Sequence, residues 1–229
     1  MAEQLSFGGG DDDDGLDIKN VQPRCACLLV LDVSGSMSGS PIAELNSGLK
    51  VFQDELRADE LAMQRVEVGI LTFGPVQIEM PFHSAETFVA PTLTAQGNTP
   101  MGAAVLQAID MIRQRKEDYK THGLPYFKPW IFLITDGAPD GNDPWQAAGE
   151  AVRQGEAAKA FSFFAIGVQG ANMETLGKLS VARPPMSLQG LKFRELFAWL
   201  STSMKQVSKS SVGSDIPLPS TAGWGSVST

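Results

Sequence analysis

Residues 25–36 read Cys-Ala-Cys-Leu-Leu-Val-Leu-Asp-Val-Ser-Gly-Ser, an apolar run that ends in a carboxylate and two hydroxyls. The apolar character is continuous, which is typical of a parallel strand that is covered on both faces. Asp32, Ser34 and Ser36 come where this strand ends, and ligands of open α/β sheets bind at that edge. All three side chains carry oxygen, which suits a hard divalent cation. The stretch therefore predicts a strand over residues 24–32 and the beginning of a metal site.

Two later segments carry matching oxygens. Thr99 lies in the turn-like sequence Gly-Asn-Thr-Pro, and Asp136 follows a second apolar run at residues 130–135. Right-handed crossovers place the loops that follow parallel strands on one rim of the sheet, so these positions can converge. Each residue alone has a simpler explanation, such as a turn residue or a helix cap. Taken together they predict one metal site, made of Asp32, Ser34, Ser36, Thr99 and Asp136.

The remaining pattern alternates strands with helices. Further strands are expected at residues 66–73, 76–82, 161–168 and 186–188, the second of them a hairpin partner at the sheet edge. Helices are expected from Ser40-Pro41 onward, from Pro100, at 172–179 and at 191–207. Asp143 and Pro144 look like a cap followed by a first-turn proline, opening a helix to about residue 159. The fold class is α/β, with a mostly parallel central sheet, one antiparallel edge strand and helices on both faces.

The length of 229 residues fits one domain with tails. A domain of this size buries roughly 70% of its unfolded surface and needs no disulfides. We expect an acidic, Gly- and Asp-rich disordered tail at 1–20, a folded domain at 21–207, and a Ser-, Pro- and Gly-rich tail at 208–229. The Asp11–Asp14 run is expected to be solvated, with cation binding as the alternative. Trp224 is either a docking anchor for a partner or packs on its own domain.

Composition excludes several classes of protein. The net charge of -8 argues against a nucleic-acid binder. No apolar run approaches the roughly 20 residues that a membrane-spanning helix needs, and no secretory signal pattern is seen. Cys25 and Cys27 lie two apart on one predicted strand, so we expect buried free thiols, with a Cys-x-Cys metal pair as the alternative. These features predict a cytoplasmic protein in a reducing compartment.

The motifs resemble the metal-ion-dependent adhesion site of von Willebrand factor A (VWA) domains. The resemblance rests on Asp32-x-Ser34-x-Ser36, on Thr99, and on Asp136 with the glycine after it, and it extends over residues 22–207. It implies the Rossmann-like VWA fold. It also implies that the three hydroxyls ligate the cation directly, whereas the two carboxylates hold it largely through water.

Within that family the chain is similar to the bacterial tellurium-resistance TerY-like group. This similarity rests on residues 31–37, 97–102 and 135–139, with Asp143 and Trp145 after them, and on a tail that ends near Gly223-Trp224. It implies a bacterial stress response. The implied protein partners include a phosphatase and a kinase-like protein.

The expected function is non-enzymatic. A divalent cation, magnesium (Mg²⁺) or alternatively manganese (Mn²⁺) or calcium (Ca²⁺), would complete its coordination with an acidic residue of a partner protein. One rival is a metal-dependent hydrolase or phosphotransferase that uses Asp32 as a nucleophile. The second carboxylate usual in such enzymes is replaced by Ser34, and neither a phosphate-binding loop nor a nucleophile elbow appears. The other rival is a structural subunit in which the metal braces the loops.

Overall fold

The computed structural model describes residues 16–214, 217–222 and 224–227. Seven strands form one sheet in the order β3-β2-β1-β4-β5-β6-β7. Neighbouring pairs from β2 through β6 are parallel, whereas β3 and β7 run antiparallel to their partners at the two edges. The strands are β1 (Cys25–Asp32), β2 (Val66–Phe73), β3 (Gln77–Ser84), β4 (Trp130–Thr135), β5 (Ser162–Gly167), β6 (Met186–Leu188) and β7 (Gly225–Val227).

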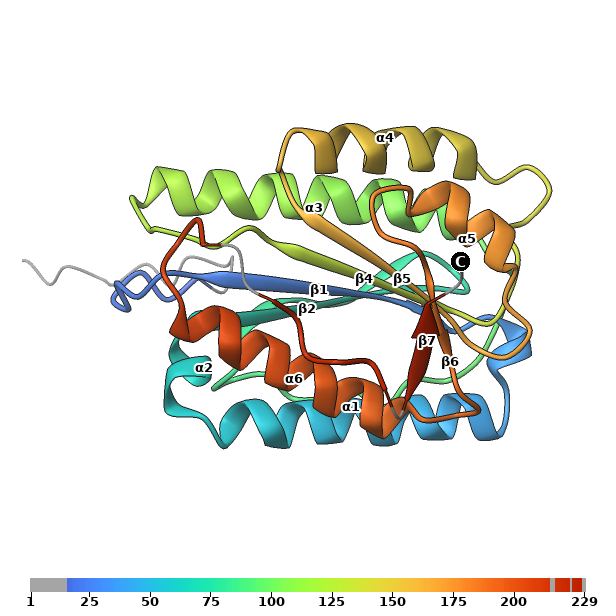
Figure 1. The fold of residues 1–229 in the computed structure, drawn as a ribbon, viewed down its shortest axis with the longest axis horizontal. Coiled ribbons are helices and arrows are strands. Elements are labelled where there is room, and N and C mark those ends of the chain that lie inside the picture. Colours follow the sequence, from blue (N-terminus) through green and yellow to red (C-terminus); the bar gives the residue numbers. More distant parts are fainter. Residues whose placement is uncertain (1–15, 215–216, 223, 228–229) are drawn as a thin grey trace, which may run out of the picture.

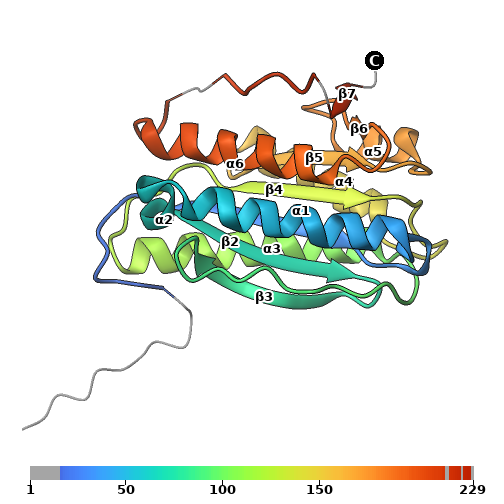
Figure 2. The same cartoon turned by 90° about the horizontal axis from the view of Figure 1, so that it is seen from below.

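Helices cover both faces of the sheet, as Figures 1 and 2 show. One face carries α1 (Ser40–Arg57), α2 (Glu60–Arg65) and α6 (Phe193–Lys209). The other face carries α3 (Met101–Thr121), α4 (Trp145–Ala157) and α5 (Met173–Leu179). Every residue of β1 is buried, which confirms the two-sided burial that its continuous apolar run predicts. The predicted α/β class with a mostly parallel sheet is confirmed.

The carboxyl ends of β1, β2, β4 and β5 meet at one edge of the sheet, on the right in Figure 1. Their amino ends meet at the opposite edge. A six-residue strand such as β4 spans roughly 20 Å at about 3.3 Å per residue. The molecule therefore has two separate rims, and the predicted metal ligands all belong to the first.

A buried charge cluster lies at the amino-end rim. Glu67, the second residue of β2, is 3% exposed. Its carboxylate pairs with Arg24 Nε at 3.4 Å and Arg115 Nε at 2.8 Å, and it accepts a hydrogen bond from the Tyr119 hydroxyl at 2.5 Å. Burial, followed by the charge of Glu67, raises the pKa of Tyr119, which keeps the hydroxyl protonated as a donor. Two cations and a hydroxyl thus compensate one buried carboxylate.

The two cysteines are free and fully buried, and both belong to the core on the α1 and α6 side of the sheet. Burial, with a smaller contribution from the charge of Glu67, raises the pKa of the Cys25 thiol to about 12. The Cys25 thiol contacts the Met204 sulfur at 3.9 Å. The expectation of buried free thiols is confirmed, and no third cysteine or histidine accompanies the pair to form a metal site in the described part of the chain.

The chain after α6 makes contacts that its composition does not predict. Trp224 is 3% exposed and packs against Trp199, with ring centroids 5.2 Å apart. The adjoining β7 pairs with β6, which adds a second antiparallel edge strand to the one predicted at β3. Trp224 therefore packs on its own domain, which is one of the two predicted alternatives. The predicted boundaries at residues 20 and 207 stay predictions, and residues 1–15, with the Asp11–Asp14 run, lie outside the described residues.

No helix in the described ranges is both long enough and apolar enough to cross a membrane.

Candidate metal centre

Asp32 is the last residue of β1 and is fully buried. Its Oδ1 accepts a hydrogen bond from the Ser34 backbone N–H at 2.8 Å, which is the local turn that aspartate favours. Its Oδ2 accepts from the Thr135 hydroxyl at 2.5 Å, and Thr135 ends the neighbouring strand β4. The carboxylate is thus held at the carboxyl-end rim by one contact from its own loop and one from the next strand.

Ser34, Ser36 and Asp136 form a chain of side-chain contacts at the same rim. The Ser34 and Ser36 hydroxyl oxygens lie 3.0 Å apart, and the Ser36 hydroxyl donates to Asp136 Oδ1 at 2.7 Å. A 3-10 turn over Gly35–Met37 brings the two serines to one side of the loop. The loop after β1 therefore meets the loop after β4 through hydroxyl and carboxylate oxygens.

Thr99 reaches the rim because a long loop interlocks with the turns after β1 and β2. The Gly35 N–H donates to the Gly97 carbonyl at 3.1 Å, and the Asn98 N–H donates to the Gly74 carbonyl at 3.1 Å. Gly97 has φ of +73°, and a Cβ there would lie 2.3 Å from the Gly74 carbonyl oxygen. Only glycine permits both this backbone angle and this close approach. The glycine two residues earlier therefore sets the position of Thr99.

Two aspartates of the loop after β4 hold the segment that carries Thr99. The Thr99 N–H donates to both carboxylate oxygens of Asp140 at 3.2 Å. Asp143 accepts from the N–H groups of Gly102 at 2.6 Å and Ala103 at 3.1 Å, which are orphan donors of the first turn of α3. Both carboxylates thus tie the start of α3 to the loop after β4.

The sequence prediction for Asp143 was wrong in this respect. It was expected to cap the helix that follows it, but α4 begins after Pro144 with no side-chain cap. The start of α3 lies against the start of α4, since a Cβ on Gly102 would be 2.4 Å from the Trp145 nitrogen. Asp143 therefore caps a helix 40 residues earlier in the chain. The α3 helix likewise begins after Pro100 with no side-chain cap, so the Thr99 hydroxyl does not serve as one.

Thr99 and Asp32 lie on either side of a small space at Gly137. The point that a Cβ would take on Gly137 lies 3.6 Å from Thr99 Oγ1 and 3.9 Å from Asp32 Oδ2. The absence of a side chain there leaves room between the threonine hydroxyl and the buried carboxylate. The structure thus brings all five predicted side chains to one rim, and their role as metal ligands stays a prediction.

The negative charge of this rim has no positive partner among the described residues. Burial raises the pKa of Asp32, the hydrogen bonds from Ser34 and Thr135 lower it in part, and the charge of Asp136 raises it. In the described ranges, no lysine, arginine or histidine forms an ion pair with Asp32 or Asp136. A buried carboxylate beside a second carboxylate is costly without a cation. The donor set is carboxylate and hydroxyl oxygen only, so it fits a hard divalent cation.

Sequence reasoning missed the residues that support the site. Thr135 immediately precedes Asp136, yet its contact to Asp32 depends on the pairing of β1 with β4. Asp140 likewise supports the site, because its carboxylate accepts from the Thr99 backbone N–H. No local pattern identifies either role, because both partners are more than 40 residues away in the chain.

Comparison with known proteins supports this geometry at the level of the fold. Residues 28–193 match the family model for the von Willebrand factor type A domain. No curated protein matches the sequence. Among solved structures, the pilus adhesin SpaC of Lactobacillus rhamnosus GG superposes with a TM-score of 0.65 at 16% identity. That match covers 82% of this chain and 30% of the adhesin.

Two further structures share the fold. The vWF domain of the type V pili tip protein Mfa5 from Porphyromonas gingivalis gives a TM-score of 0.56 at 10% identity, covering 86% of this chain and 100% of that domain. Proximal thread matrix protein 1 of the mussel byssus gives 0.52 at 14% identity, covering 81% of this chain and 49% of that protein. This chain therefore spans less than half the length of SpaC and of the byssus protein.

Proposed function

The chain belongs to the von Willebrand factor type A domain family, and we propose that it is a non-enzymatic interaction module that works through a divalent cation. The cation would be held by Asp32, Ser34, Ser36, Thr99 and Asp136. An acidic side chain of a partner protein would complete the coordination. The observation that carries this proposal is the convergence of two carboxylates and three hydroxyls, with no basic partner in the described part of the chain, on one rim of the sheet.

The donor set favours magnesium. Mg²⁺ takes oxygen ligands at about 2.0–2.1 Å and keeps several of its waters, so a site with few charged ligands suits it. In the described residues, no group of three or more His, Cys, Asp or Glu side chains gathers to hold a metal. The proposed site, with two carboxylates and three hydroxyls, leaves room for an external ligand. Mn²⁺ and Ca²⁺ prefer the same hard oxygen ligands and are separate arms of the test below.

The partner's chemistry follows from charge. Hydroxyl oxygens are neutral, so a cation held mainly by them retains most of its positive charge and attracts an anionic ligand. The side chains of this rim would orient the cation: Thr135 fixes the Asp32 carboxylate, and Asp140 fixes the backbone of Thr99. Ser36 and Asp136 link the two loops on either side. A carboxylate from another protein is the simplest external ligand for such a site.

The biological setting rests on the sequence motifs alone. The similarity to the TerY-like group supports a role in a bacterial stress response of the tellurium-resistance kind, in the cytoplasm. It also supports a phosphatase or a kinase-like protein as the partner. Those two classes are the first baits to try with the purified chain.

Metal binding is tested by calorimetric titration of the full chain with Mg²⁺, Mn²⁺ and Ca²⁺. Wild type should bind one ion, and Asp32→Ala and Ser34→Ala should each lose that binding while their circular dichroism is unchanged. Asp54→Ala removes an exposed carboxylate on α1 and serves as the matched control. Equal binding by wild type and Asp32→Ala would contradict the assigned ligands.

Partner binding is tested by a pull-down from the native host in Mg²⁺, in chelator and with Asp32→Ala. A partner captured only by wild type in Mg²⁺ supports metal-mediated adhesion. A partner captured in all three conditions contradicts it. Loss of thermal stability in chelator without loss of the partner would favour the structural-subunit alternative, and turnover of a phosphate ester abolished by Asp32→Asn would favour the phosphotransferase.

A further inference from the structure

A cavity of about 820 Å³ opens at the amino-end rim, opposite the metal centre. Its walls come from the residues just before β4, the first residues of β5 and the ends of α3 and α4. The segment after α6 closes one side through Val212, Gly213, Ser214, Pro217 and Leu218. A hollow of this size accommodates a small organic molecule, since ligand pockets typically measure roughly 300–1,000 Å³.

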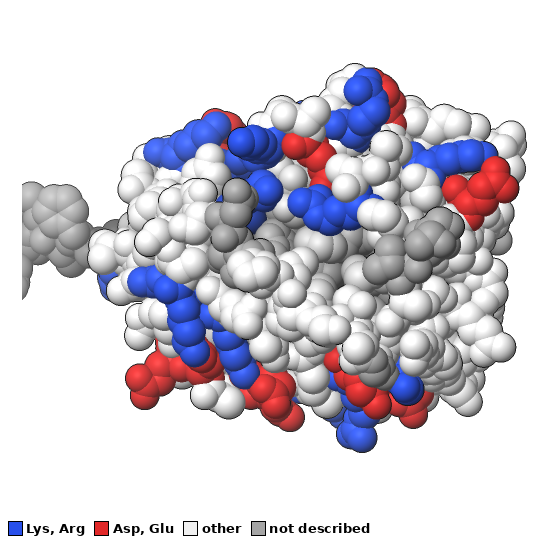
Figure 3. Space-filling view, viewed as in Figure 1, with Lys and Arg blue, Asp and Glu red and all other residues white. Residues whose placement is uncertain are grey.

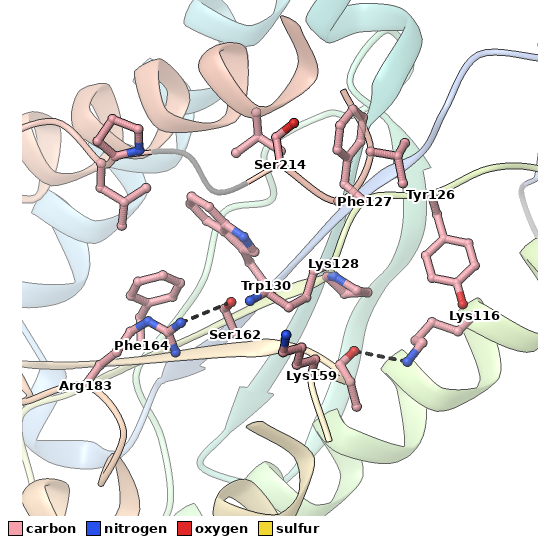
Figure 4. Close-up of a pocket in the computed structure, with 17 residues that line it drawn as sticks. Lys116, Tyr126, Phe127, Lys128, Trp130, Lys159, Ser162, Phe164, Arg183 and Ser214 are labelled. Carbon is pink, nitrogen blue, oxygen red and sulfur yellow. Dashed lines mark hydrogen bonds between the residues drawn. The ribbon is translucent and has the colours of Figure 1, made fainter. Parts of the chain in front are cut away.

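Basic side chains concentrate around this hollow, although the protein as a whole carries a net charge of -8. Lys116, Lys128, Lys159 and Arg183 all line it. Figure 3 shows Lys and Arg side chains gathered beside the hollow on this face. In Figure 4 the ammonium groups of Lys128 and Lys159 and the guanidinium of Arg183 point into the space around Ser162. The local charge is therefore opposite in sign to that of the molecule.

Only some of this positive charge is compensated. Arg183 pairs with Glu156 and lies 3.4 Å from the Ser162 hydroxyl, and Lys116 donates to the Ala160 carbonyl at 3.1 Å. The side-chain ammonium groups of Lys128 and Lys159, in contrast, have no hydrogen bond or ion pair with any other residue that the structure describes. Two ammonium groups at the mouth of a cavity are thus available to an external anion.

The backbone of Lys159 is a second, independent observation. Lys159 follows the end of α4 with φ of +54°, the one positive φ at a residue other than glycine in the described ranges. The Ala160 N–H donates to the Gly155 carbonyl at 2.8 Å, which is the closure that normally places glycine at the preceding position. Residues that carry a Cβ disfavour this left-handed conformation. A residue that strains the turn and also places a charge at a cavity indicates a site of function.

The inner wall of the cavity is apolar and aromatic. Trp130 and Phe164 line it with ring centroids 5.1 Å apart, and the Arg183 guanidinium lies 5.1 Å from the Phe164 ring centroid. Val212 and Leu218 line it from the segment after α6 and are 49% and 37% exposed. An apolar wall next to uncompensated ammonium groups suits a ligand with an apolar body and an anionic end.

We propose that this cavity is a binding site for a small amphipathic organic anion. Its acidic group would lie among Lys128, Lys159 and Arg183, with the Ser162 hydroxyl as a further donor. Its ring or apolar body would lie against Trp130 and Phe164 and be covered by Val212 and Leu218. The site is independent of the metal centre because the length of the sheet separates the two rims.

The test is a pair of fluorescent probes that share one ring system. Anilinonaphthalene sulfonate carries an anionic group, and phenylnaphthylamine is the neutral analogue. The full-length wild type should bind the sulfonate at one site per chain, at least about tenfold more tightly than the neutral probe, because hydrogen bonds to charged groups contribute roughly 1.5–3 kcal/mol. The sulfonate affinity should fall as salt is added and should not change in chelator.

Variants locate the probe. The double variant Lys128→Ala, Lys159→Gly should weaken sulfonate binding at least about tenfold and leave binding of the neutral probe unchanged. Glycine suits the backbone of residue 159, so loss of folding cannot explain the effect, and the melting temperature verifies this. Lys50→Ala on α1 removes an exposed lysine far from the cavity and is the matched control. Equal affinity for the two probes, or a double variant that binds like wild type, would overturn the proposal.

Discussion

Asp32 and Glu67 are buried carboxylates on neighbouring strands, near opposite ends of the sheet. Glu67 has two arginines and a tyrosine hydroxyl as partners. Asp32 has neutral donors from Ser34 and Thr135 and no cation among the described residues, with a second carboxylate close enough to raise its pKa further. Described residues of the chain compensate the charge of Glu67, and none of them carries a positive charge that pairs with Asp32.

This difference separates a structural charge from a functional one. Removal of one member of a buried ion cluster destabilises the fold, because the remaining charges lose their compensation. A buried carboxylate without a cation destabilises the fold that contains it, and binding of an external cation relieves the cost. Replacing the carboxylate by an amide should therefore destabilise the fold at Glu67 but not at Asp32.

The largest effect is expected at the amino-end rim, where Glu67 lies. Glu67→Gln keeps the shape of the side chain but removes the buried negative charge that pairs with Arg24 and Arg115. We expect the free energy of unfolding to fall by about 3–5 kcal/mol. Urea denaturation measures this, with Glu86→Gln, an exposed glutamate after β3, as the control. A loss no greater than that of the control would mean that the cluster is not the compensated unit described above.

Metal addition should stabilise the opposite rim. A cation that binds only the folded chain adds about 2.7 kcal/mol at a concentration one hundred times its Kd. Thermal melts of wild type should therefore shift upward with Mg²⁺ and return in chelator. Asp32→Asn should show no shift, whereas Glu86→Gln should shift like wild type. A shift of equal size in Asp32→Asn would place the cation elsewhere in the protein.

Asp143 provides an intermediate case, since helix N–H groups compensate its carboxylate instead of arginines. Asp143→Ala removes the cap of α3 and should lower the free energy of unfolding by about 0.5–2 kcal/mol. It should also weaken metal binding, because Thr99 immediately precedes that turn. Asp143→Asn retains an acceptor oxygen and should lose less of both. Unchanged metal binding in both variants would show that the cap does not affect the metal centre.

The smallest effect is expected for Asp32→Asn in chelator. The asparagine carbonyl can accept from the Ser34 N–H, and its amide can donate to the Thr135 hydroxyl. Because a buried charge without a cation is removed, we expect the free energy of unfolding to equal or exceed that of wild type, by up to about 1 kcal/mol. Denaturation in chelator measures it. A loss as large as that of Glu67→Gln would show that the two carboxylates play the same role.

Much of the fold could be predicted because the signals are local. The continuous apolar run at 25–31 predicts a strand covered on both faces, and the spacing of apolar residues in α1 and α6 predicts their buried sides. Glycine and proline mark the turns that end these elements. The rule that parallel strands end on one rim then predicts that Asp32 and Asp136 meet.

Other features depend on partners distant in the sequence. Asp143 looks like the cap of its own helix, but the nearest orphan N–H groups belong to α3. The composition after residue 207 leaves open whether Trp224 binds a partner or its own domain, and in the structure Trp224 packs against Trp199 while β7 extends the sheet. Lys128, Lys159 and Arg183 are scattered along the chain, and only the folded chain brings them to one cavity.

The sequence by itself therefore determined the α/β class, the order of the elements and the five oxygen-bearing side chains of the carboxyl-end rim. Backbone propensity and apolar spacing act over a few residues, so a short stretch of sequence is enough to predict them. Only the tertiary structure decided that cations among the described residues pair with Glu67 but not with Asp32, and that basic side chains surround a cavity at the other rim. Electrostatic compensation depends on which groups lie within a few ångströms, and folding alone sets those distances.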